Sequence, residues 1–163
     1  MKVVDNANSR ELVRFALQTK ENLIIEKSKI ESIDYIVSST DDNAKKYGIV
    51  IRYRNIPDSE TRSNVFNDLE KIKENCNNNQ LIPTIAFILY DKAEKSAYVF
   101  LVTVEKLEEL ANSKIIEDEI SYVDQGIQIK YGINLTTEKK MLDELKAHLD
   151  YVEITTGKMD FRE

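Results

Sequence analysis

Hydrophobic positions in the first third of the chain follow first a helical and then a strand-like spacing. Ser9 is a suitable N-cap, and apolar residues recur at helical spacing from there to about Lys20. Strand-like runs follow at 23–25 and 33–37, and residues 47–54 form a longer run whose side chains alternate between two faces. This part of the chain predicts one helix followed by three strands.

The middle of the chain contains the most apolar segments. Ser63 is the expected cap of a second helix, because apolar residues after it fall on one helical stripe. The runs 84–90 and 97–104 are almost continuously apolar and are joined by a short charged turn. Such runs are typical of neighbouring central strands that are covered on both faces. Leu107 and Leu110 indicate a short helix after them.

The last third of the chain is more polar. Segments 120–123 and 127–131 flank a turn that contains Gly126, a pattern that favours a β-hairpin. A final helix, capped by Thr136 or Thr137, would carry an apolar stripe. The stripe consists of Met141, Leu145 and Leu149.

Element order and composition together predict an α/β domain. We expect a central mixed β-sheet flanked by helices, with an added hairpin and a C-terminal helix. The chain has 163 residues, of which 42% are hydrophobic and 32% charged. A chain of this length buries about two-thirds of its unfolded surface and needs no disulfide or metal to fold. We expect one domain over residues 1–154 and a flexible tail over 155–163, where apolar residues are few.

Charge and cysteine content limit the functional classes. The chain carries 29 acidic and 23 basic residues, a net charge of −6, whereas proteins that bind duplex nucleic acid non-specifically usually have a basic excess. No apolar run approaches the ~18 residues of a membrane span, and the first residues lack the apolar core of a signal peptide. Cys76 is the single cysteine. We therefore expect a cytoplasmic protein that is not associated with a membrane.

Several common catalytic and metal-binding arrangements are missing from the sequence. It has no glycine-rich phosphate loop and no C-x-x-C pair, and one His with one Cys excludes the usual zinc sites. A nucleophilic triad would have to use His148, which has no orienting partner at a readable spacing. Cys76 is most simply a structural thiol.

One acidic and one basic residue stand out on the predicted strands. Asp34 lies in the run 33–37, while Val50 and Arg52 share a face of the next strand. In an ordinary hairpin register Asp34 and Arg52 could face one another. The simplest interpretation is a cross-strand ion pair at a sheet edge.

This arrangement resembles the PD-(D/E)XK, or restriction-endonuclease-like, superfamily, and within it a small bacterial branch of unknown function. In that superfamily an acidic helix precedes a strand with Asp. The next strand carries Glu or Gln, any residue, and Lys, and a helix and two apolar strands follow. The order of elements from Ser9 to Leu110 is similar, with 33–37 as the Asp strand and 47–54 as the strand that ends in a basic residue.

The resemblance implies roles for three residues. Asp34 would bind a metal, Mg²⁺ or Mn²⁺, Glu11 would be an auxiliary acid, and Arg52 would neutralise phosphate or transition-state charge. The second carboxylate of the superfamily falls on Val50, which cannot bind a cation, and its lysine falls on Arg52, which cannot act as a neutral base. We therefore expect a weak or inactive metal-dependent nuclease. It would bind nucleic acid or regulate a catalytic partner in a bacterial or phage defence or mobile-element context.

Arginines and tyrosines form a second candidate surface. Arg52, Arg54 and Arg62, with Tyr47 and Tyr53 interleaved, could contact the backbone or bases of a nucleic acid. The simpler interpretation is a solvated strand face followed by a loop.

An acidic run suggests an alternative function of another class. An acidic surface can bind a basic partner, as in an immunity or inhibitor protein that neutralises a basic toxin or a nucleic-acid enzyme. The ordinary interpretation of such a run is a solvated face. Separately, the apolar stripe of the last helix, which is more often part of a core, could form the interface of a homodimer. The run consists of Glu105, Glu108, Glu109, Glu117, Asp118 and Glu119.

Overall fold

The computed structural model describes residues 3–41, 44–56, 62–67, 69–112, 120–123, 126–130 and 135–155. These ranges form four helices and nine strands. Their order is α1 (Asn6–Gln18), β1 (Leu23–Lys27), β2 (Tyr35–Ser39), β3 (Lys46–Ile56), β4 (Arg62–Asn67), α2 (Leu69–Asn77), β5 (Ile82–Asp91), β6 (Ser96–Thr103), α3 (Val104–Asn112), β7 (Ile120–Val123), β8 (Gly126–Lys130), α4 (Leu135–His148) and β9 (Tyr151–Thr155).

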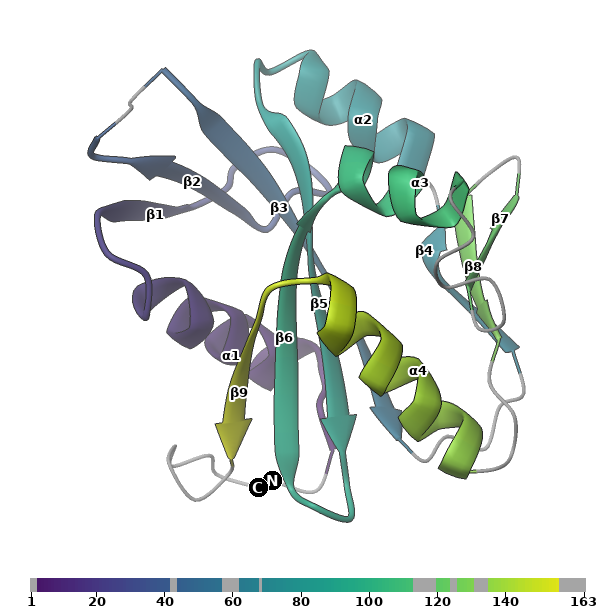
Figure 1. Cartoon of the computed structure of the whole chain (residues 1–163). Coiled ribbons are helices and arrows are strands. Elements are labelled where there is room, and N and C mark those ends of the chain that lie inside the picture. The colour runs from purple at the N-terminus through teal and green to yellow at the C-terminus, as the bar shows by residue number, and fades with distance from the viewer. Residues whose placement is uncertain are drawn as a thin grey trace.

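Six strands form the main sheet, in the order β1-β2-β3-β5-β6-β9 (Figure 1). Strands β3 and β5 run parallel, and every other neighbouring pair is antiparallel. The prediction of an α/β fold with a central mixed sheet flanked by helices is confirmed.

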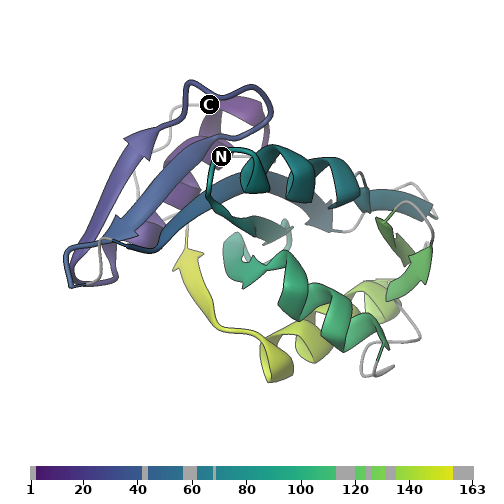
Figure 2. The same ribbon diagram turned by 90° about the horizontal axis from the view of Figure 1, so that it is seen from above.

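Helices cover both faces of this sheet (Figure 2). Helix α1 packs on one face, where its buried residues join side chains of β2, β3, β5 and β6 in one core cluster. Helices α2, α3 and α4 pack on the other face and form a second cluster with the alternate side chains of the same strands. None of the helices in the described ranges is long and apolar enough to cross a membrane.

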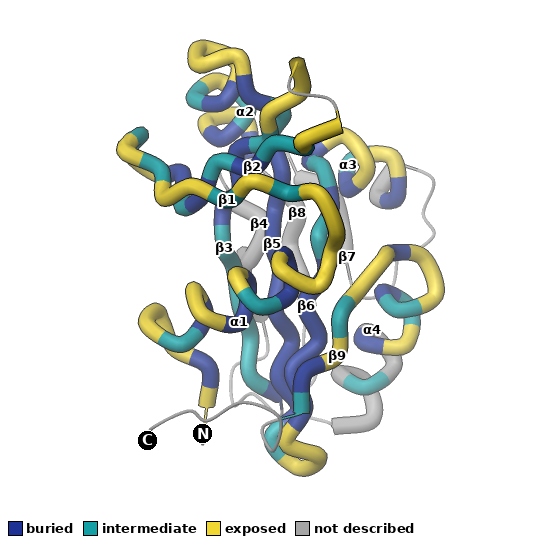
Figure 3. Tube along the Cα trace, turned by 90° about the vertical axis from the view of Figure 1, so that its left-hand side faces the viewer, coloured by how far each residue is buried: buried dark blue, intermediate teal, exposed yellow. Residues whose placement is uncertain are grey.

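The two apolar runs form the centre of the sheet, as predicted. Strand β5 is buried from Thr84 to Asp91, and β6 is buried from Ser96 to Phe100, whereas the edge strand β1 is half-buried or exposed (Figure 3). Because both faces of β5 and β6 are covered by helices, their sequences lack the polar alternation of a half-exposed strand.

A second, smaller sheet has the order β4-β8-β7. The predicted hairpin is present as β7 and β8, which contact α3 and α2 respectively. The helix predicted to begin at Ser63 is wrong in its first part: β4 pairs antiparallel with β8, and α2 begins only at Leu69. Pairing with a distant strand supplies the backbone hydrogen bonds there, and local helical spacing does not reveal such pairing.

Strand β9 was not predicted. It follows α4 directly and pairs antiparallel with β6, from Ser96↔Thr155 to Phe100↔Tyr151. It includes Thr155, the first residue of the predicted tail, and residues 156–163 lie outside the described residues. In α4 itself Leu145 and Leu149 of the predicted stripe are buried, as is the neighbouring Leu142, and the side chain of Met141 lies outside the described residues.

Helix α1 begins earlier than expected. Asp5 is its N-cap and forms a capping box with Asn8: each side chain accepts a hydrogen bond from the backbone nitrogen of the other residue. Ser9, the predicted cap, lies inside the helix and is buried. The stronger reciprocal cap therefore sets the start of the helix.

Candidate functional site

Asp34 lies where β2 stops pairing with β3. The ladder between these strands runs from Ser38↔Lys46 to Tyr35↔Ile49. The backbone nitrogen of Asp34 continues it with a 2.8 Å hydrogen bond to the carbonyl of Ile49. Two residues further along β3 the hydrogen bond is made by the Asp34 side chain, whose Oδ2 accepts a 2.8 Å hydrogen bond from the backbone N–H of Ile51. The carboxylate thus replaces a strand carbonyl at this edge.

The other carboxylate oxygen of Asp34 binds an arginine that the sequence did not single out. The Nη2 of Arg10, on α1, is 2.8 Å from Oδ1 of Asp34. The Arg10 side chain is 52% exposed and that of Asp34 only 19%. Both oxygens of Asp34 are therefore engaged, one by a cation and one by a backbone amide, at a largely covered position.

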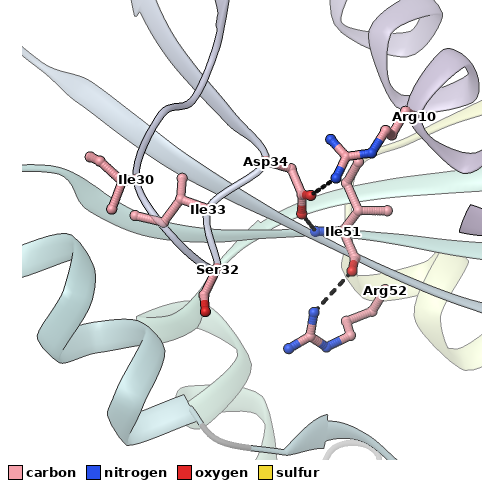
Figure 4. A pocket seen from close by; sticks show the side chains of 7 residues that line it. All are labelled: Arg10, Ile30, Ser32, Ile33, Asp34, Ile51 and Arg52. Carbon is pink, nitrogen blue, oxygen red and sulfur yellow. Dashed lines mark hydrogen bonds and ion pairs between the residues drawn. The ribbon is translucent and has the colours of Figure 1, made fainter.

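Arg52 reaches the same edge from the opposite face of the sheet. Val50 and Ile56, on its face of β3, belong to the cluster under α2, α3 and α4, whereas Ile51 packs toward α1. The Arg52 guanidinium turns back, and its Nη1 donates a 3.0 Å hydrogen bond to the carbonyl of Ile51 (Figure 4). Arg52 and Asp34 line the same cavity, and Asp34 forms its ion pair with Arg10 of α1.

These residues line a solvent-accessible cavity of about 470 Å³. Its lining consists of Arg10, Ile30, Ser32, Ile33, Asp34, Ile51 and Arg52. Ser32 has a φ of 70°, a conformation that non-glycine residues adopt infrequently. With two arginines and one aspartate the lining has a formal charge of +1 in a chain whose net charge is −6.

A second cavity of about 270 Å³ adjoins the first. Arg10, Asp34 and Ile51 line both cavities, and the smaller one adds Asn6, Ser9 and Tyr53. The bridge from Arg10 through Asp34 to the Ile51 amide therefore lies between the two spaces.

The donor set of this site does not fit Mg²⁺ or Mn²⁺. These hard cations need several oxygen ligands in octahedral geometry. Asp34 is the one carboxylate in the lining of either cavity, and Arg10 and Ile51 already bind it. Val50, where the resemblance led us to expect the second ligand position, is 2% exposed and packs into the core. No group of three His, Cys, Asp or Glu side chains suited to a metal occurs among the described residues.

Glu11, the predicted auxiliary acid, lies on the outer side of α1. The buried residues Ser9, Leu12, Val13, Ala16 and Leu17 define the inner stripe. At about 100° per residue, Arg10 falls at the border of this stripe and Glu11 on the opposite side of the helix. Glu11 is exposed and lines neither cavity.

The predicted basic and aromatic patch does not form one surface. Arg52 and Arg54 share one face of β3, whereas Tyr47 and Tyr53 pack toward α1 on the other face. The hydroxyl of Tyr53 is 3.0 Å from Oδ1 of Asn6, and Tyr53 lines the smaller cavity. The backbone of Arg62 belongs to β4, and its side chain lies outside the described residues.

The acidic run is described only in part. Glu105 and Glu109 are exposed on α3, while Glu108 forms a 3.1 Å ion pair with Lys73 of α2. The hydrogen bonds of Glu108 and Glu70 raise the pKa of Lys73. Residues 117–119 lie outside the described residues.

The single cysteine and histidine have no place in this site. Cys76 is fully buried beneath β3, and burial raises the pKa of its thiol, which disfavours a reactive thiolate. His148 is exposed at the end of α4, where its Nδ1 is 2.9 Å from the carbonyl of Glu144. Both positions agree with the simple structural interpretation of these residues.

Comparison with known proteins leaves the site to be judged by its geometry. No family model matches the chain, and neither the curated proteins nor the solved structures include a match.

Arg10 was missed because the sequence shows which residues of α1 are apolar but not which strand its polar border faces. The one available signal was its place beside the apolar stripe.

Proposed function

We propose that this protein is a nuclease-like domain without a working metal site, which binds phosphate groups of nucleic acid at the cavity between Arg10 and Arg52. The observation that carries this proposal is the meeting of two guanidinium groups, from opposite faces of the sheet, in one cavity. A planar guanidinium presents paired N–H donors that match two oxygens of a phosphate.

The local charge supports phosphate binding at this place. The lining carries a formal charge of +1 although the chain as a whole is acidic, and this local charge favours an anion in the cavity. Its volume of about 470 Å³ lies in the range of ligand pockets and suits a nucleotide-sized unit. Binding that depends on few phosphate contacts is weak and sensitive to salt.

The order of elements supports the nuclease-like part of the proposal. A helix, three antiparallel strands, a second helix and two central strands follow in the sequence of the restriction-endonuclease-like fold, with β4 added before α2. Asp34 and Arg52 are retained at the site, while Val50 faces the core. The proposed role is nucleic-acid binding or regulation of a catalytic partner, in the cytoplasm of a cell that carries a defence or mobile-element system.

The acidic protein-binding alternative has less support. Of the described part of the acidic run, Glu108 is neutralised by Lys73, which leaves Glu105 and Glu109 as its exposed charges on α3. Two carboxylates on a helix are an ordinary solvated surface.

The proposal is tested by fluorescence anisotropy with a labelled single-stranded oligonucleotide at low salt. We expect Arg52→Ala to weaken binding several-fold, and Arg14→Ala to leave it unchanged. Arg14 is the matched control because it is exposed on α1 and lines neither cavity. Equal effects of the two substitutions would overturn the proposal. We also expect no cleavage of the oligonucleotide with Mg²⁺ or Mn²⁺; metal-dependent cleavage that Asp34→Ala abolishes would show a working nuclease instead.

A further inference from the structure

We infer that the Asp34 carboxylate competes with the bound phosphate for the guanidinium of Arg10, so that phosphate binding must replace the ion pair between Arg10 and Asp34. This inference rests on the proposed function and adds the regulation of its site. The relevant contact is the 2.8 Å ion pair between Arg10 Nη2 and Asp34 Oδ1.

Arg10 is placed to contact an anion in either cavity. It lines both spaces, and half of its side chain is exposed to solvent. The guanidinium therefore has surface available to a ligand while one of its nitrogens is held by Asp34. An incoming phosphate and the Asp34 carboxylate present the same kind of acceptor to the same group.

Asp34 does not leave the cavity when Arg10 turns to a ligand. Its second oxygen accepts the N–H of Ile51, and its own backbone nitrogen is bonded to Ile49, so the carboxylate is anchored at both ends. It then remains as a negative charge beside the bound phosphate. The formal charge of the lining is +1 with Asp34 and would be +2 without its charge.

The consequence is a site whose affinity is held down by one residue. With Asp34 ionised, Arg10 is already neutralised, and its interaction with a phosphate replaces an existing ion pair. Removing the charge of Asp34 should make Arg10 a full phosphate contact. Because each phosphate neutralised releases counterions, the change also appears in the salt dependence of binding.

The test is the binding of a fluorescein-labelled single-stranded oligonucleotide to Asp34→Asn over a range of salt concentrations. Asparagine keeps a carbonyl oxygen for the Ile51 N–H but has no charge to hold Arg10. We expect about tenfold tighter binding. A gain of this size lies between the Coulomb attraction of two unit charges in bulk water and their attraction near a protein surface. The slope of log K against log salt should steepen by about 0.7. A second neutral variant, Asp34→Ser, should show the same direction.

Two controls separate the competitor role from a general change of charge. Asp41→Asn makes the same substitution at an exposed position beyond the other end of β2 and should leave affinity unchanged. Adding Arg10→Ala to Asp34→Asn should abolish the gain, because the gain requires the released guanidinium.

The outcomes distinguish this inference from the proposed function. If Arg52→Ala weakens binding but Asp34→Asn binds no more tightly than Asp41→Asn, the competitor role is wrong and the binding function stands. If Arg52→Ala changes the binding affinity neither in the wild-type protein nor in Asp34→Asn, the proposed function is wrong, and the inference that rests on it is wrong too.

Discussion

The Asp34 carboxylate and the backbone nitrogen of Ile51 are 2.8 Å apart at the point where β3 stops pairing with β2. A strand edge exposes unpaired N–H and C=O groups that other chains can pair with. Here Asp34 accepts the N–H of Ile51, and the guanidinium of Arg52 covers its carbonyl. Asp34 and Arg52, two residues of the candidate site, therefore also satisfy the backbone groups of Ile51 at this edge of β3.

Replacing Asp34 separates its capping role from its ion pair. We expect Asp34→Ala to lower the free energy of unfolding by about 2 kcal/mol, because the N–H of Ile51 loses a charged acceptor. The pair with half-exposed Arg10 contributes little to this loss. Asp34→Asn, which keeps an acceptor, should cost less than about 1 kcal/mol. Urea unfolding measures both, with exposed Asp41→Ala as a control expected within about 0.5 kcal/mol of wild type.

Gly48 of β3 packs tightly against Cys76 of α2. A Cβ at this position would lie 2.9 Å from Sγ of Cys76 and 3.3 Å from Cδ1 of Leu81. We expect Gly48→Ala to destabilise the protein by about 1–3 kcal/mol through overpacking. Cys76→Ala removes the sulfur that the new Cβ at position 48 would contact, so the double variant should be more stable than the sum of the two single effects predicts. Additive effects in chemical unfolding would show that the close approach is not the cause.

Tyr98 makes stability sensitive to alkaline pH. Burial, assisted by the nearby charges of Glu153 and Glu94, raises its pKa from 10.0 to about 12. The folded state holds the phenol proton more tightly than the unfolded chain, so this stability is complete below pH 10 and is lost as the pH rises toward 12. The full difference corresponds to about 3 kcal/mol. Tyr98→Phe should show a flatter decline of unfolding free energy between pH 10 and 12; an unchanged decline would place the titrating group elsewhere.

The unforeseen strand β9 has one buried anchor. Ile154 is 1% exposed and joins the cluster beneath α1, whereas Val152 is only half-buried. We expect Ile154→Ala to cost about 2–4 kcal/mol in thermal or chemical unfolding, and Val152→Ala clearly less. A negligible cost for Ile154→Ala would mean that β9 contributes little to the main sheet.

The central strands could be predicted because their local sequence alone indicates that both of their faces are buried. Strands β5 and β6 are covered on both faces, and residues 84–90 and 97–104 are accordingly almost continuously apolar. The hairpin of β7 and β8 carried its own turn signal at Gly126. Strands β4 and β9 depend on partners far away in sequence, and their short segments show no comparable pattern.

The candidate site could be predicted only in part, for a similar reason. Asp34 and Arg52 stood out because neighbouring strands bring them together, and the structure places both in one cavity. Choosing Arg10 rather than Glu11 required knowing how α1 is rotated on the sheet. That rotation follows from the whole buried stripe and from the Asp5 cap, which begins the helix before Ser9.

The most direct test of nucleic-acid binding at this cavity is a titration of ¹⁵N-labelled protein with a short single-stranded oligonucleotide, followed by NMR. We expect the largest shift changes at the backbone amides of Ser32, Asp34, Ile51 and Arg52 and at the side-chain Nε of Arg10 and Arg52, with α3 unaffected. Changes confined to α3, or no changes at low salt, would contradict binding at the cavity between Arg10 and Arg52.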